Sequence, residues 1–166
     1  MTPTMTAKQE QVTPIEADVV GVATSELLRG AVAVVRLLLP EWRAVRPKDR
    51  RPEMAVEAAE EWLARPLPNL ASHASLIAKE CTKARSASLG DQHQIAEAAR
   101  AIAQIPSART DAAARACSIE ALAKAEEYAL YRHAIAGIYG KQPEVRHHIL
   151  STLREGAVRK FGGSSQ

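Results

Sequence analysis

The chain has 166 residues and a mass of 17.9 kDa, which suffices for one domain with its own hydrophobic core. Hydrophobic residues make up 46% of it and aromatic residues 4%, which excludes a wholly disordered chain and is a poor fit to a β-sandwich. Two cysteines, Cys81 and Cys117, are too few for a disulfide scaffold and lack the CxxC spacing of zinc sites. Alanine is abundant and favours helix, because its side chain loses no entropy there.

The charge of the chain is mildly basic and spread along the sequence. There are 22 Lys and Arg against 19 Asp and Glu, which gives a formal net charge of +3 and a pI near 9.0. Residues 69–110 and 143–166 each hold an excess of two positive charges, and the other segments lie between −1 and 0. Polyanion-binding proteins commonly show a basic stripe or cluster, which this distribution lacks. The excess also suits an acidic surface on a protein partner.

The most apolar stretch, residues 19–39, is interrupted by Glu26, Arg29 and Arg36. Charged side chains at the centre of a bilayer are costly, so we expect no membrane span. The N-terminal residues do not have the pattern of a signal peptide. A cytoplasmic location is therefore expected.

Apolar residues at helical spacing, with proline and glycine between them, predict a series of helices. Residues 1–12 are expected to be a disordered tail. A helix is predicted to start at Thr13, where the sequence has a capping pattern, and to continue to Trp42. Kinks are expected at Gly21 and at Pro40, since proline removes a hydrogen-bond donor from the helix.

Two further helices are predicted after a loop at residues 46–51. The first starts at Pro52 and has an expected inward stripe of Met54, Ala58 and Trp62. The second is capped by Asn69 and stopped by Gly90, and its inward positions are Leu70, Ala74, Ile77, Cys81 and Ala84.

The last three predicted helices complete the domain. One opens at Asp91 and is stopped by Pro106, and Thr110 is expected to cap the longest helix, residues 111–139. Two apolar stripes on that helix indicate a central position, because both faces then need cover. A final helix starts at Pro143, with Val145, Ile149, Leu153 and Ala157 facing inward. We predict an all-α fold, a single compact bundle of about six helices over residues 13–160, with a disordered tail at 161–166.

Some histidines and carboxylates of the chain are candidate catalytic or metal-binding groups. Glu144 and His147 have the spacing of half a di-iron motif, but the chain contains no second copy, so a solvated helix start is expected and no metal site. His133 falls on an apolar stripe of the longest helix. It is a candidate general base or pH-sensitive contact, or else a hydrogen-bonded core histidine. Cys81 and Cys117 lie at apolar mid-helix positions, where thiols are usually inert.

The predicted loop and its flanks concentrate cations: Arg43, Arg46, Lys48, Arg50 and Arg51. Guanidinium groups form bidentate contacts with phosphates and carboxylates, so this segment is a candidate site for phosphate or for an acidic protein partner. The alternative is a solvated turn whose arginine stems cover Trp42.

The sequence around this loop resembles a known family. Residues 39–52 read LPEWRAVRPKDRRP, and residues 55–62 read AVEAAEEW. An aromatic helix end, a charged RP…DxRP turn and an alanine-rich helix ending in Trp are similar to a family of bacterial immunity-like proteins, which are small, alanine-rich and all-helical. The resemblance extends over about residues 25–158. It implies an all-helical domain that binds a cognate toxin stoichiometrically, and it carries over no catalytic residue.

We therefore expect a binding protein and not an enzyme, with a protein partner and no cofactor, metal or membrane contact. The five cations around the loop are the expected partner contacts. Self-association stays open, because apolar area on the longest helix can be covered by a second copy. The alternative function is a basic helical subunit that accompanies nucleic acid, and a steep dependence of binding on salt would distinguish it.

Overall fold

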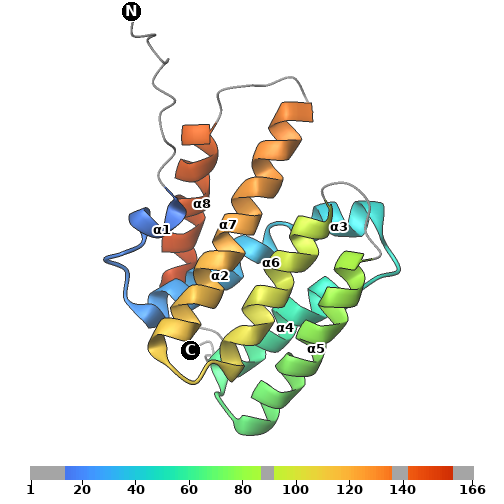
Figure 1. Ribbon diagram of the computed structural model, residues 1–166, viewed down its shortest axis with the longest axis vertical. Helices are drawn as coiled ribbons and strands as arrows, with labels where there is room; N and C mark the ends of the chain where they lie inside the picture. The colour runs from blue at the N-terminus through green and yellow to red at the C-terminus, as the bar shows by residue number, and fades with distance from the viewer. Residues whose placement is uncertain (1–13, 87–91, 136–141, 159–166) are drawn as a thin grey trace, which may run out of the picture.

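The computed structural model describes residues 14–86, 92–135 and 142–158, and all regular structure within them is helical (Figure 1). Six helices have 13 to 25 residues: α2 (Thr24–Arg36), α4 (Arg51–Ala64), α5 (Pro68–Ser86), α6 (Gln92–Gln104), α7 (Asp111–Ile135) and α8 (Gln142–Ala157). The shorter elements are α1 (Ile15–Asp18), α3 (Leu39–Val45) and the 3-10 turn η1 (Ile105–Ser107). The prediction of an all-α bundle of about six helices is confirmed.

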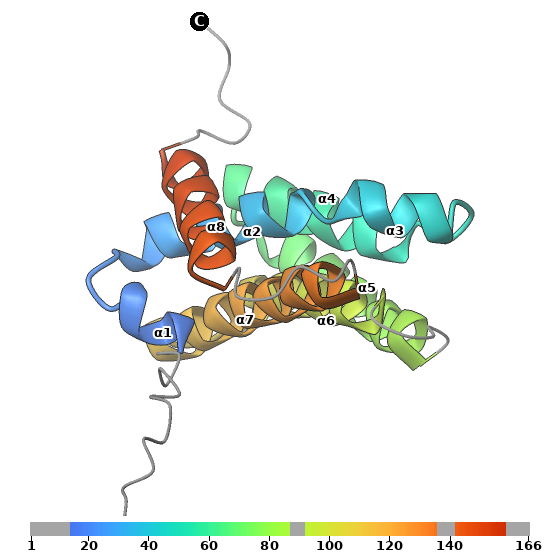
Figure 2. The same cartoon turned by 90° about the horizontal axis from the view of Figure 1, so that it is seen from above.

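The helices form two layers. Figure 2 shows α5, α6 and α7 side by side in one layer, with α2, α3 and α4 in the other and α8 against α2. The longest helix, α7, contacts α2, α6 and α8, which agrees with its predicted central place. The inner face of α6 is almost wholly small, since its buried side chains are Ile95, Ala96, Ala98, Ala99, Ala101, Ile102 and Ala103. Small side chains let α5 and α7 approach α6 closely from either side.

The N-terminal helical segment differs from the prediction of one kinked helix. It is divided into α1, α2 and α3, and a side chain of α7 stabilises the non-helical segment after α1. Arg115 of α7 donates hydrogen bonds to the carbonyl oxygens of Val19 (3.0 Å) and Val22 (2.7 Å). These carbonyls therefore have partners outside a helix, so the chain can turn at Gly21 without leaving buried acceptors unsatisfied. The second break is followed by Pro40 in the first turn of α3.

The predicted inward stripe of α4 is wrong at Met54 and confirmed at Ala58, while Trp62 is partly buried and packs against the core. Met54 is 37% exposed and Trp62 is half-buried, whereas the buried positions include Ala55, Val56 and Ala59 together with the predicted Ala58. Positions four apart advance by about 40° around a helix axis with 3.6 residues per turn, so Met54 and Trp62 diverge by about 80°. The helix instead turns its smaller residues towards α5 and α6.

Asn69 is not the cap of its helix as predicted, because α5 begins at Pro68 and Asn69 lies inside it. Most of the other predicted positions agree with the structure. Thr110 caps α7, with its Oγ1 accepting a hydrogen bond of 3.0 Å from the Ala113 backbone N–H. The predicted inward residues of α8 are buried, and so are those of α5 except for the half-buried Leu70. On α7, Tyr128 is buried but Tyr131 is exposed. The expected cap and stop at Thr13, Gly90 and Asp91, the two disordered tails and the end of the long helix after residue 135 lie outside the described residues.

Glycine sets the distance between α2 and α8. A Cβ atom added to Gly30 would lie 2.6 Å from both the Cγ and the backbone oxygen of Leu153, closer than real Cβ contacts. Gly156 faces α2 in the same way, against Ala33 and the backbone of Gly30. Arg29 then donates a hydrogen bond of 2.9 Å to the carbonyl of Ala157 at the end of α8. The backbones of α2 and α8 thus pack closely at Gly30 and Gly156, and the hydrogen bond from Arg29 holds the end of α8 against α2.

We predict that Gly30→Ala destabilises the protein by about 1–2 kcal/mol, because overpacking against a backbone atom outweighs the higher helix propensity of alanine. The matched control is Gly21→Ala, since a Cβ there meets nothing within 4 Å. It should be neutral or slightly stabilising. Thermal unfolding followed by circular dichroism measures both, and a Gly30→Ala variant as stable as the parent protein would contradict the glycine contact.

Candidate functional site

The loop between α3 and α4, residues 46–50, is closed over a buried indole. Trp42 is 2% exposed, and its Nε1–H donates a hydrogen bond of 2.7 Å to the backbone oxygen of Asp49. The guanidinium of Arg46 lies 5.8 Å from the centroid of the Trp42 ring, within range of a cation–π interaction. The predicted loop and the predicted cover of Trp42 by an arginine stem are both present, and the indole fixes the path of the loop.

Asp49 connects this loop to the first turn of α4. Its Oδ1 accepts hydrogen bonds from the backbone N–H (3.1 Å) and Nε (2.9 Å) of Arg51, and its Oδ2 accepts one from Nη2 (2.8 Å). The hydrogen bond from the Arg51 side chain holds the pKa of Asp49 below its usual value. The charge of Arg51 is thus turned towards Asp49 in a bidentate pair, and one N–H of the helix start is satisfied.

Glu53 forms ion pairs with two arginines of the loop and its flank, Arg43 and Arg50. Its Oε1 accepts a hydrogen bond of 2.8 Å from Arg43 of α3, and its Oε2 accepts one of 3.1 Å from Arg50. Arg50 also lies 3.4 Å from Glu57, one turn further along α4. The hydrogen bond from Arg50 is the main cause of a lowered pKa at Glu53. Two guanidinium groups from opposite sides of the loop therefore share one carboxylate.

A cleft of about 220 Å³ opens beside this cluster. Two of its lining residues, Leu39 and Trp42, are buried and apolar, and four others carry charge: Arg43, Asp49, Arg50 and Glu53. The lining residues are Leu39, Trp42, Arg43, Pro47, Asp49, Arg50 and Glu53.

The predicted partner contacts have different places in this arrangement. Arg43 and Arg50 line the cleft, whereas Arg46 covers Trp42 and Arg51 is engaged by Asp49. Lys48 is exposed and forms no ion pair with any described residue. Their positive charges are therefore neither equivalent nor equally available to a partner.

Several cleft residues were not predicted from the sequence: Leu39, Trp42, Pro47, Asp49 and Glu53. The spacing of Arg50 and Glu53, three apart, is a signal for a local ion pair that could have indicated one of them. The side chain of His133 lies outside the described part of the chain, so its predicted role stays a prediction.

The other charged clusters join helices to one another. Arg146 of α8 pairs with Glu126 of α7 and with Asp18 of α1, and both Arg146 and Glu126 are largely buried. Arg100 of α6 contacts Glu97 on its own helix and Glu120 on α7. These contacts explain the charged residues at the layer edges as links in the fold.

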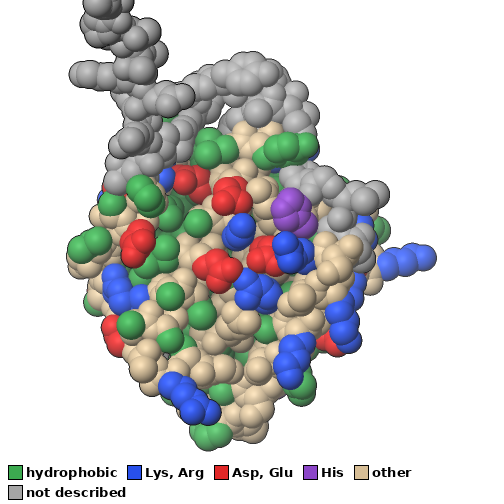
Figure 3. Space-filling model, viewed as in Figure 1, with side chains coloured by type: hydrophobic (Ala, Val, Ile, Leu, Met, Phe, Trp, Pro, Cys, Tyr) green, Lys and Arg blue, Asp and Glu red, His purple; other side chains and the backbone are tan. Residues whose placement is uncertain are grey.

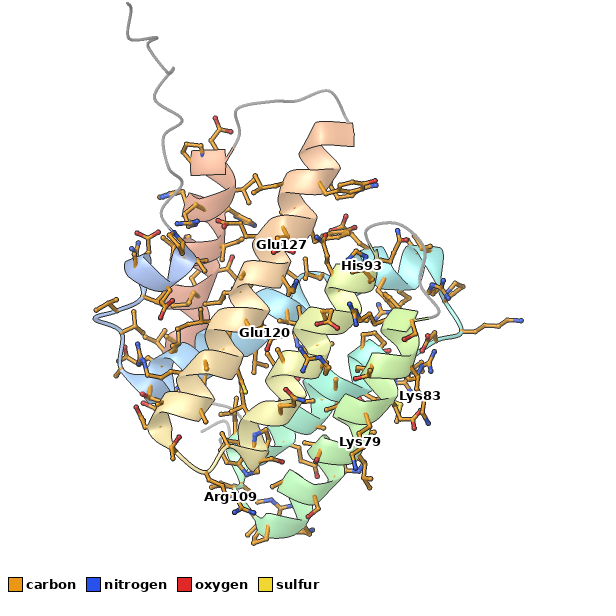
Figure 4. All side chains as sticks on the ribbon, in the orientation of Figure 1. Lys79, Lys83, His93, Arg109, Glu120 and Glu127 are labelled. Atoms are coloured by element: carbon orange, nitrogen blue, oxygen red, sulfur yellow. The ribbon has the colours of Figure 1, made fainter. Side chains whose placement is uncertain are left out.

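The face formed by α5, α6 and α7 carries both signs of charge. Figure 4 shows Lys79 and Lys83 on α5, with Glu120 and Glu127 on α7. On this face acidic and basic side chains are interleaved, without a continuous basic surface (Figure 3).

The two thiols are not in reactive surroundings, and the suggested metal ligands lie at the surface. Burial raises the pKa of the Cys81 thiol to about 12, and burial also raises that of Cys117. Both are thus protonated at neutral pH, as expected of structural thiols. Glu144 and His147 are exposed in the first half of α8, and nowhere in residues 14–86, 92–135 and 142–158 do three His, Cys, Asp or Glu side chains gather as metal ligands.

Comparison with known proteins adds no relative to these observations: no family model, curated protein or solved structure matches this chain. Among the helices described, none has both the length and the apolar character needed to cross a membrane.

We predict that Asp49→Asn lowers the free energy of unfolding at pH 7 by about 1 kcal/mol, a charge-assisted hydrogen bond discounted for contact with solvent. The pKa of Asp49 is lower in the folded protein than in the unfolded chain. Its stabilisation is therefore present above the ordinary carboxyl pKa near 3.9 and is lost as the pH falls through the lowered value.

The difference between wild type and Asp49→Asn should accordingly narrow below about pH 4. Urea unfolding at several pH values between 3 and 7 measures it. Glu61→Gln, a change at an exposed carboxylate on α4, is the control and should show no such narrowing. A difference that stays constant over this range would exclude the ion pair as its source.

Proposed function

We propose that this chain is a bacterial, cytoplasmic binding protein that neutralises a cognate toxin by forming a stoichiometric complex with it. The observation that carries the proposal is the cationic surface of the α3–α4 loop, which is held in shape before any partner arrives. The same residues, 39–62, carry the resemblance to immunity-like proteins. Binding without catalysis is consistent with thiols kept protonated by burial.

Preorganisation is what makes this loop suitable for recognition. The indole of Trp42, the carboxylate of Asp49 and the carboxylate of Glu53 each hold a separate part of it. A partner that binds such a surface loses less conformational entropy than one that must order a flexible loop. Over half of the Arg43 and Arg50 side chains remains exposed, so they can contact a partner without leaving Glu53.

The charge around the loop favours an acidic partner. Residues 42–57 contain five basic and three acidic side chains, an excess of two positive charges. Glu41, the next carboxylate before them, is directed to α7, where Tyr128 donates a hydrogen bond of 2.8 Å to it and Arg132 lies 3.4 Å away. A local positive excess accelerates association with an acidic surface.

A role beside nucleic acid is less well supported. Phosphate-backbone binding needs cations that follow the spacing of many phosphates. The cations of the loop are confined to one turn, and those of the α5–α7 face alternate with carboxylates.

The test compares two single charge reversals, Lys48→Glu and Arg109→Glu. Both cations are exposed, both stand outside helices and neither is in an ion pair within the described ranges. Arg109 lies where α7 begins, at the opposite end of the bundle from α3 (Figures 1 and 4). The two variants therefore have the same net charge and differ in the place of the change.

The partner is first captured from the native cells with wild type and with Arg109→Glu as bait. We predict that this partner associates with Lys48→Glu at least about tenfold more slowly than with wild type or Arg109→Glu at low salt. Surface plasmon resonance measures the rates. The captured protein is identified, expressed alone to test its toxicity, and then co-expressed with each variant to test for rescue of growth. Equal rates for the two variants, or a partner that is not toxic, would refute the proposal, and so would steeply salt-dependent binding of DNA or RNA without a protein partner.

A further inference from the structure

A short segment at the start of the described chain, residues 14–22, lies at the edge of the bundle beside α7 and α8 (Figures 1 and 2). It contains α1 and most of the connection from α1 to α2. We propose that this segment is a strap, which detaches from α7 and α8 as one unit while the rest of the bundle stays folded. An ion pair between Asp18 and Arg146 determines how often the strap opens.

The strap has few apolar contacts for its length. Its buried side chains are Ile15 and Val19, Val22 is partly buried against the core, and the other six of its nine residues are exposed. Each residue that is held in place loses backbone entropy, so two buried side chains offset the ordering of this segment only narrowly. Segments with such a balance open locally at a small fraction of the free energy of global unfolding.

The opening should end at α2, which is held far more firmly. This helix packs against α4, α7 and α8. Its buried residues are Leu27, Leu28, Gly30, Ala31, Val32, Val34 and Val35. Detachment of residues 14–22 therefore does not carry α2 with it.

Charge attaches the strap to the bundle. The strap carries two carboxylates, Glu16 and Asp18, and no cation, whereas the side chains that hold it are arginines. Arg146 of α8 donates a hydrogen bond of 2.6 Å from Nη1 to Oδ2 of Asp18. Arg115 of α7 donates to two backbone carbonyls of the strap, at 2.7 and 3.0 Å. A negatively charged segment is thus attracted to two cations of the bundle.

Both arginines keep a partner when the strap leaves. Nε and Nη2 of Arg146 donate to the two carboxylate oxygens of Glu126, with 2.9 Å between Nη2 and Oε1. Arg115 also donates to the hydroxyl of Thr24 in α2, at 3.2 Å. The side chains of Arg146 and Glu126 are 13% and 11% exposed, so an opening that separated them would leave buried charges unpaired at high cost. Detachment of the strap avoids that cost, because these two residues stay paired with each other.

Salt should act on the strap selectively. The Asp18 side chain is 40% exposed, so its attraction to Arg146 is in contact with solvent and is screened by dissolved ions. The pair of Arg146 with Glu126 is largely buried and is screened much less. Higher salt therefore favours the open strap without separating α7 from α8.

The experiment measures amide hydrogen exchange by NMR on the full-length protein alone, so its outcome does not depend on the proposed function. The probes are the N–H groups of Ala17, Val19 and Val22, which donate to backbone oxygens of the strap itself. The buried Ile102 in α6 reports unfolding of the whole bundle. We expect the strap amides to be protected, but to exchange at least about a hundredfold faster than that of Ile102. Their exchange should also depend less on urea, since a local opening exposes less surface.

Two carboxylate variants test the ion pair. After correction for intrinsic rates, Asp18→Asn should speed exchange of the strap amides about fivefold, as expected for loss of a partly exposed ion pair. Glu16→Gln is the matched control, because Glu16 is exposed in the same segment and forms no ion pair with any described residue. It should change these rates by less than about twofold. Raising NaCl from about 0.02 M to about 0.5 M should reproduce the effect of Asp18→Asn in wild type and add nothing in that variant.

A core variant tests whether the strap opens by itself. Ile77→Val shortens a buried side chain of α5, whose main contacts are α4 and α6. It should speed exchange at Ile102 about fivefold, because it lowers the free energy of global unfolding. The strap amides should be unaffected, because their opening leaves the core intact.

Equal acceleration of the strap amides and of Ile102 by Ile77→Val would overturn the inference, because the strap would then open only with the whole bundle. Strap amides that show no protection in wild type would also overturn it, since the segment would not be held at all. Equal rates in Asp18→Asn and Glu16→Gln would exclude the ion pair as the control of opening.

Discussion

The bundle depends on the close approach of helices whose facing surfaces contain many alanines and, between α2 and α8, two glycines. Small side chains bring backbones together but supply little volume and few distinctive shapes, so such faces can slide or rotate with modest loss of packing. The glycine contact between α2 and α8 removes part of this freedom, because Gly30 and Gly156 must each stay opposite the other helix. Arginine side chains remove much of the rest by joining elements at fixed atoms.

Two sets of arginines differ in the sequence separation of their partners. Arg29 and Arg115 contact groups 91 to 128 residues away, and Arg146 contacts Asp18 at a separation of 128 and Glu126 at 20. Each of the three joins separate elements of the bundle. Arg43, Arg50 and Arg51 instead contact carboxylates 2 to 10 residues away. The first group sets the arrangement of the helices, and the second shapes one turn. Changes in the second group can therefore alter a surface without loosening the core.

The sequence predicted more of the fold than of the site, because the signals it contains describe short segments of the chain. Prolines, caps and apolar spacing are properties of short segments, so Thr110 and the inward face of α8 follow from them directly. The orientation of α4 does not follow from them, because alanine fits inside and outside equally well and Met54, which the pattern placed inside, is 37% exposed. The loop cations were also evident, and the contacts of Asp49 with Arg51 and of Glu53 with Arg50 are local. The contact of Arg43 with Glu53, in contrast, forms only when α3 and α4 are placed about the Trp42 indole.

The pairing of Arg43 and Arg50 with Glu53 does not remove them from recognition. Ion pairs with solvent-exposed partners contribute about 0–1 kcal/mol, so a second carboxylate can share these guanidiniums at little cost. What the pairs provide is position, since a long side chain that is already oriented loses less freedom when a partner binds. Glu53 thus lowers the net positive charge of the loop surface, and in return it fixes the positions of the Arg43 and Arg50 side chains. Lys48 keeps its full charge, but no neighbouring carboxylate in the described part of the chain fixes its position. It is therefore better suited to attracting an acidic partner at a distance than to recognising the shape of the partner's surface.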